Sequence, residues 1–182
     1  MRARAFRPLQ RGVSLIELMT AIAVFTILTV MAFPVYTTWI ANQQVRTATE
    51  SVVEGLRVAQ TEALKRNAAV KFVLDTGTGW EVQLDADDSV LRKTAFAEGS
   101  AKVALTVAPV GTSTILFDGL GRPLDKDAVR FTKRVTIDVD SSASITDVRK
   151  MRIVIDTAAA TGVGIRTCDP KLGSTDPRGC PT

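Results

Sequence analysis

The sequence predicts an α+β protein in which one long N-terminal helix packs on an antiparallel β-sheet. Two observations carry this prediction. Residues 13–66 hold a helical pattern that is first uniformly apolar and then amphipathic. After residue 67 the hydrophobic period changes from three or four residues to two, the period of a strand. The chain of 182 residues is therefore expected to carry one modest domain behind an apolar helical segment.

The apolar segment from Val13 to Phe33 contains a single charged residue, Glu17. A helix of this length can cross a bilayer. A carboxylate at membrane depth costs about 2.5–3.5 kcal/mol on insertion scales, so it usually marks a function and needs a partner. Ser14 and Glu17 also have the spacing of a capping box, a local role that can coexist with the first.

A basic segment, residues 1–12, precedes the apolar run and ends at Gly12. It contains four arginines and no acid, whereas the whole chain has 23 basic and 19 acidic residues. Without this segment the charges balance, so the remainder has no general basic excess to attract nucleic acid. The arginines are expected to hold the N-terminus on the cytoplasmic side. An ordinary secretory signal is disfavoured because no small-residue cleavage site follows the apolar run.

The second half of the helix, residues 37–67, is amphipathic. Its apolar residues recur at spacings of three and four and so share one face. They are Val45, Ala48, Val52, Leu56, Ala59 and Ala63. Pro34 is expected to kink the helix between its two halves, and Asn67 is suited to cap its C-terminal end.

Apolar and polar residues alternate in several short segments after Asn67, and each alternation predicts a strand. The segments are 70–74, 80–84, 103–107, 115–117, 135–139 and 151–155. Gly77 and Gly79 predict a hairpin turn between the first two. We expect one antiparallel sheet whose inner face packs on the amphipathic half of the helix, with Trp80 in the core.

The composition argues against an enzyme. The chain has no histidine, which removes the commonest general base and metal ligand. Asp85, Asp87 and Asp88 share one turn, a pattern more typical of a solvated loop than of a calcium site. Without a triad, phosphate loop or metal cluster, the sequence predicts no catalysis, no metal and no cofactor. Cys168 and Cys180 are expected to form a disulfide in an oxidising compartment.

The basic leader, Gly12, the apolar run and Glu17 together resemble a type IV prepilin signal. Three further segments resemble the GspH/FimT family of minor pilins and pseudopilins: residues 57–67 at the helix end, 115–123 (Ile-Leu-Phe-Asp-Gly-Leu-Gly-Arg-Pro) and 164–168. The resemblance implies a type IV pilin-like fold. It also implies that a prepilin peptidase cuts between Gly12 and Val13, that Val13 becomes N-methylated, and that Glu17 pairs with the N-terminal amine of a neighbouring subunit during assembly.

The resemblance divides the chain into four parts. Residues 1–12 are the cleaved leader, 13–36 the transmembrane half of the helix, 37–67 its amphipathic half, and 68–182 a β-rich periplasmic or extracellular domain. The expected location is the bacterial inner membrane, with a single pass and then assembly into a filament. The expected partners are other pilin or pseudopilin subunits, the prepilin peptidase and an inner-membrane assembly platform.

The resemblance leaves three roles open. The first is a minor pilin that primes or caps assembly of a type IV pilus, and the alternative is a pseudopilin of a type II secretion system acting in protein export. The third, a DNA-binding minor pilin, rests on a tail of the form glycine-arginine-x-arginine. Only Arg166 of that pattern is present here, and Asp169 and Asp176 offset the charges of Lys171 and Arg178. DNA is therefore not expected as a partner.

Overall fold

The structure is a computed structural model that describes residues 12–75, 79–95, 100–131, 134–143, 145, 147–156, 164–173 and 175–181. The predicted leader lies outside these residues except for Gly12, and so does Gly77 of the predicted hairpin turn. The chain divides into two units, Met1–Thr37 and Thr38–Thr182. One helix, α1 (Leu15–Arg66), begins in the first unit and continues into the second.

In the first unit, residues 15–36 of α1 are exposed and most of them are apolar. In the part of the chain that the structure describes, α1 is the one helix long and apolar enough to cross a membrane, judged by length and composition. Pro34 lies inside α1, and the helix continues through it.

The second unit contains two antiparallel sheets. The five-stranded sheet has the order β3-β2-β1-β5-β6, and the four-stranded sheet the order β4-β7-β8-β9. The strands of the five-stranded sheet are β1 (Val70–Asp75), β2 (Gly79–Leu84), β3 (Val90–Ala95), β5 (Thr114–Phe117) and β6 (Pro123–Leu124). Those of the four-stranded sheet are β4 (Val103–Ala108), β7 (Val135–Ser141), β8 (Met151–Asp156) and β9 (Gly164–Cys168).

One hydrophobic core joins α1 to both sheets. All six residues of the predicted apolar face are buried, and they share a core cluster with residues of the two sheets. Trp80 is 1% exposed and packs in this core as predicted, with its indole N–H donating to Ser51 Oγ at 2.9 Å. Gly55 lies beneath it, where the ring atoms of Trp80 and Phe72 come within 2.8 Å of a Cβ built on the glycine.

The C-terminal end of α1 is closed by a Schellman motif. Asn67 has a φ of 48°, the left-handed conformation that ends many helices. The N–H of Asn67 donates to the Leu64 carbonyl at 3.4 Å and that of Ala68 to the Ala63 carbonyl at 3.3 Å. The expected Asn67 cap is therefore present, and it turns the chain directly into β1.

The expectation of a single sheet was wrong, because the strands divide between two. β4 pairs with β7 in register Val103 to Ser141, while β5 returns to pair with β1. The resembling segment 164–168 forms the last strand, β9. Two other strands were not predicted, β6 because it spans two residues and β3 because its residues are mostly exposed on both faces. Arg92 and Lys93 of β3 instead form ion pairs with Glu54 and Glu81. An edge strand of this kind shows no alternation of apolar and polar residues.

Candidate functional sites at the two ends of the chain

The N-terminal candidate site comprises Gly12, Val13 and Glu17. Gly12 to Ser14 precede α1, and the Leu18 N–H donates the first helical bond to the Ser14 carbonyl at 3.1 Å. This places Glu17 in the first turn of the helix. A Cβ built on Gly12 meets nothing within 4 Å. Packing with the described residues therefore does not require a glycine at this position.

Glu17 differs from the other polar side chains of the apolar segment. The hydroxyls of Thr20, Thr26 and Thr29 each donate to a backbone carbonyl one turn earlier, at 2.8–2.9 Å. These threonines satisfy their donors within the helix. By contrast, the Glu17 carboxylate accepts no hydrogen bond and forms no ion pair with any residue that the structure describes. The expected capping box with Ser14 is not formed, so the carboxylate is left available to a partner outside the chain.

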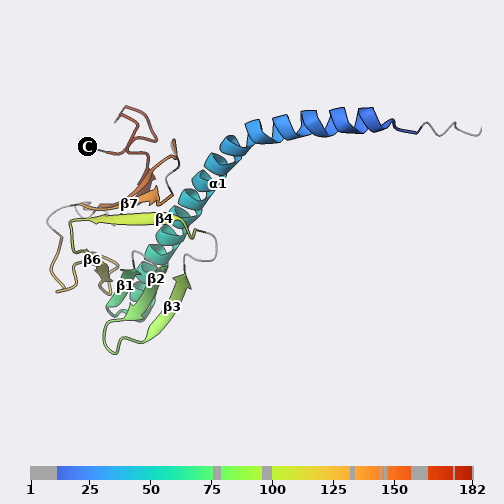
Figure 1. The fold of residues 1–182 in the computed structure, drawn as a ribbon. Helices are drawn as coiled ribbons and strands as arrows, with labels where there is room; N and C mark the ends of the chain where they lie inside the picture. The colour runs from blue at the N-terminus through green and yellow to red at the C-terminus, as the bar shows by residue number, and fades with distance from the viewer. Residues whose placement is uncertain are drawn as a thin grey trace, which may run out of the picture. The chain divides into compact units, whose positions relative to one another are not determined.

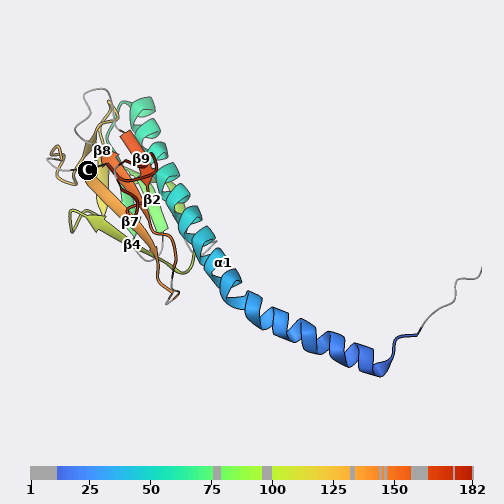
Figure 2. The same cartoon turned by 90° about the horizontal axis from the view of Figure 1, so that it is seen from above.

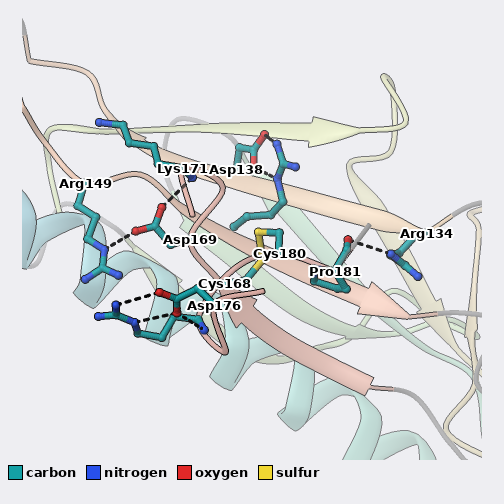
Figure 3. Close-up of a disulfide and its surroundings, with 11 residues drawn as sticks. Arg134, Asp138, Arg149, Cys168, Asp169, Lys171, Asp176, Cys180 and Pro181 are labelled. Atoms are coloured by element: carbon teal, nitrogen blue, oxygen red, sulfur yellow. Dashed lines mark hydrogen bonds and ion pairs between the residues drawn. A yellow bond between two sulfur atoms is a disulfide. The ribbon is translucent and has the colours of Figure 1, made fainter. Parts of the chain in front are cut away.

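The C-terminal candidate site is the loop closed by the Cys168–Cys180 disulfide (Figure 3). The two Cα atoms are 4.9 Å apart. The loop is also held to the rest of the second unit by hydrogen bonds. The Arg134 guanidinium donates to the carbonyl of Pro181, the residue after Cys180, at 3.2 Å. Within the loop, the Asp169 N–H donates to the Arg178 carbonyl at 2.8 Å and joins the two arms of the loop. The loop therefore forms a fixed part of the surface beside β9.

Asp169 anchors this loop to the body of the domain. It is 7% exposed, and its carboxylate accepts the Arg149 guanidinium at 2.6 Å and the Lys171 backbone N–H at 2.9 Å. Burial alone would raise the pKa of Asp169, but the Lys171 N–H and the Arg149 charge outweigh it. The pKa of Asp169 therefore lies below its ordinary value, and the carboxylate is charged at neutral pH.

The cations near the tail are largely neutralised by neighbouring acids. Arg178 pairs with Asp176 at 3.2 Å, and Arg149 pairs with Asp169. Arg166 on β9 and Lys171 in the loop are the exceptions. The Arg166 side chain is 64% exposed and its ion pair with Asp156 is long, at 3.7 Å, and the exposed Lys171 forms no ion pair with a described residue. The described surface around the tail thus offers two weakly paired or unpaired cations, Arg166 and Lys171.

A groove of about 820 Å³ runs beside Arg166, between α1, β9 and Arg92 of β3. Three consecutive residues of β9, Ile165 to Thr167, line it, and α1 contributes residues from Glu50 to Lys65. Figure 2 shows β9 beside the second half of α1. The sequence gives no direct signal for this groove, because its walls come from three distant segments.

Other polar clusters serve the fold. Lys71 pairs with Asp85 at 3.1 Å and Asp88 at 2.6 Å, so the acidic turn considered for calcium is partly neutralised by a lysine. No group of three or more metal-ligating side chains is found among the described residues. In the segment 118–123, the Gly121 carbonyl accepts the Gln60 amide at 3.1 Å, which braces the end of α1. This brace gives the resembling segment a structural role that the sequence did not reveal.

Two family models match the chain. Residues 48–159 match the family described as Type II transport protein GspH, and residues 7–33 match the prokaryotic N-terminal methylation motif. No curated protein matches the chain.

Two solved structures are similar to this chain. The type IV minor pilin FimU of Pseudomonas aeruginosa is 18% identical, with a TM-score of 0.51, over 67% of this chain and 87% of that one. The minor pseudopilin EpsH from the type 2 secretion system of Vibrio cholerae is 14% identical, with a TM-score of 0.48, over 71% of this chain and 99% of that one. At 18% identity the likeness to FimU concerns the fold alone.

Proposed function

Since the chain belongs to the GspH family, whose members are minor pilins and pseudopilins, we propose that it is a structural subunit that primes or caps a type IV pilus. In this proposal residues 13–36 cross the inner membrane and the second unit lies on its outer side. A prepilin peptidase removes residues 1–12 after Gly12, and the new amine of Val13 is methylated. The subunit then leaves the membrane through an assembly platform and joins other pilins.

The observation that carries the proposal is the carboxylate of Glu17, which has no partner among the described residues, whereas the hydroxyls of Thr20, Thr26 and Thr29 bond within the same apolar helix. A charge at membrane depth is costly unless an opposite charge meets it. After cleavage, the ammonium group of Val13 in a neighbouring subunit would supply that charge. Breaking such a buried pair leaves one charge unpaired, at about 3–5 kcal/mol, so the pair favours one register of packing between helices.

A matched pair of substitutions tests the role of Glu17. Glu17→Gln keeps the size of the side chain and removes its charge, so we expect a processed membrane protein that no longer enters filaments. Thr20→Val lies in the same apolar stretch and removes a hydroxyl that is satisfied within the helix, so we expect normal incorporation. The measurement is the amount of the protein in sheared filaments relative to the membrane fraction. Normal incorporation of the Glu17→Gln protein would show that the charge pair is not needed.

A second role, a pseudopilin of a type II secretion system, is favoured by the description of the matching family as a transport protein. A clean deletion in the native host separates the two roles when surface pili and released proteins are measured together. Lost pili with normal protein release supports the minor pilin, whereas lost release with normal pili supports the pseudopilin. The DNA-binding role is a weaker third candidate, because it depends on Arg166 beside cations that already have acidic partners.

A further inference from the structure

The groove beside β9 exposes the edge of a sheet. β9 is the last strand of the four-stranded sheet and pairs with β8 on one side. Successive side chains of a strand point to opposite faces of its sheet. A groove lined by the three consecutive residues Ile165, Arg166 and Thr167 therefore runs along the edge of β9 and not over one of its faces. Backbone donors and acceptors on such an edge can pair with an added strand.

The opposite wall of the groove is long enough to hold an extended segment. α1 lines the groove from Glu50 to Lys65, which spans about 23 Å at 1.5 Å per residue. A strand of about seven residues covers the same length. Val53, Val58 and Ile165 give the groove an apolar component, and each of them is buried or half-buried in the second unit.

The charges in the groove indicate which kind of side chain would fit. Each of its glutamates already has a cation within 3.0 Å: Glu50 has Arg46, Glu54 has Arg92 and Glu62 has Arg66. Two arginines are left over. Arg57 forms no ion pair with any described residue, and Arg166 has only the 3.7 Å contact to Asp156. An acidic side chain of the occupant would complement both.

The edge strands that the structure describes in a second copy of this chain do not supply such a segment. The strands at the edges of the two sheets are β3, β6, β4 and β9. None of them contains an aspartate or glutamate, and β3 and β9 contain basic residues. Pairing of one edge of this chain with another would therefore bring like charges together or leave Arg57 and Arg166 unmatched.

We propose that an extended segment of a different filament subunit, bearing an apolar residue and an acidic residue, adds a strand to β9 and occupies this groove. The proposal rests on the proposed function, because it takes the partner from the same filament. Strand addition would give affinity through the backbone, and the acid facing Arg57 and Arg166 would select the partner. Phosphate ligands such as DNA fit less well, because they would leave the apolar part of the groove and the free edge of β9 without a partner.

Photo-cross-linking in the native host tests the proposal on the full chain. A benzophenone amino acid at Thr167 should give an adduct with another pilin-fold subunit, mapped by mass spectrometry to a segment that contains an acid. With the probe moved to Ile165, the mapped position should shift by about two residues, because paired strands advance together. The exposed Val110, outside the groove, is the control position. A probe at Met19 reports helix packing in the filament independently.

Charge reversal gives the matched comparison. Arg57→Glu with Arg166→Glu should lower the Thr167 adduct at least about tenfold, because an acid would then face an acid. Lys126→Glu, a reversal at an exposed site outside the groove, should leave the adduct unchanged. The proposal is overturned by a Thr167 adduct with this chain itself or with DNA, by an equal adduct at Val110, or by no adduct. If the Met19 probe still captures filament subunits in such a case, the proposed function stands. Loss of both the Thr167 adduct and the Met19 adduct would refute the strand-addition proposal and the proposed function.

Discussion

Replacement of Gly55 by alanine tests the close packing of α1 on the five-stranded sheet. An added Cβ would lie 2.7 Å from Phe72 Cε2 and from Trp80 Cδ2. Both rings are buried, at 0% and 1% exposure, so neither can swing away freely. Overpacking of this kind costs about 1–3 kcal/mol. Alanine in place of glycine inside a helix gains about 1 kcal/mol, which opposes the cost.

The clash should win, because the new methyl meets two rings at once. We expect a net loss of up to about 2 kcal/mol in the free energy of unfolding, and a Tm lower by about 4–8 °C. The assay is thermal unfolding of the full chain in detergent, followed by circular dichroism. Gly173→Ala is the control, since among the described residues its Cβ would meet only Thr175 Oγ1, at 3.8 Å.

A double-mutant cycle identifies the cause of the effect. If the ring of Trp80 is the obstacle, Gly55→Ala should cost less in a Trp80→Phe background, where the ring is smaller. A Gly55→Ala protein as stable as the wild type would refute the reasoning, because α1 could not then lie so close to β1 and β2.

Two further predictions concern the C-terminal loop. Serine at both Cys168 and Cys180 opens a loop with a sequence separation of 12. In the chain-entropy model the free energy of unfolding falls by about 3 kcal/mol. The Tm should therefore fall by about 6–12 °C. Reductant should produce the same fall in the wild type and none in the variant, whereas an unchanged Tm would contradict a stabilising disulfide. The pKa of the Asp169 carboxyl is lower in the folded protein than its ordinary value of 3.8, so the charged carboxylate stabilises the fold fully at neutral pH. This stabilisation begins to fall as the pH drops below 3.8, and it is lost below the lowered pKa. The Tm advantage of the wild type over Asp169→Asn should shrink over that acidic range, and an advantage independent of pH would show that the charge of Asp169 contributes nothing.

The elements with a strong hydrophobic period could be predicted from the sequence. The amphipathic half of α1 carries its apolar residues on one face. β1 and β7 bury alternate residues, and in β2 the buried Trp80 and Val82 alternate with Glu81 and Gln83. The order of apolar and polar residues along the chain therefore predicts these elements. The exposed β3 lacks that alternation. The division into two sheets depends on pairing between distant segments, such as β4 with β7, which local order does not encode.

The candidate sites, too, could be predicted from the sequence only where a residue stands out from its neighbours in the chain. Glu17 stands out because a single charge interrupts a long apolar run, and the two cysteines stand out by type alone. The brace between Gln60 and Gly121 and the bond from the Arg149 N–H to Asn42 Oδ1 join residues 61 and 107 positions apart. Long-range contacts of this kind have no local signal, and the groove beside β9 is built from the same kind of contact.

The single core shared by α1 and both sheets has a mechanical consequence. The two sheets are not hydrogen-bonded to each other among the described residues, and the core side chains of α1 pack in one cluster with residues of both sheets. A force that pulls α1 along its axis would therefore load both sheets at once, in shear, through side chains such as Val52 and Leu56. Many contacts would have to slide together before the helix could move. A subunit built in this way resists extraction of its helix far better than one whose helix could peel away residue by residue.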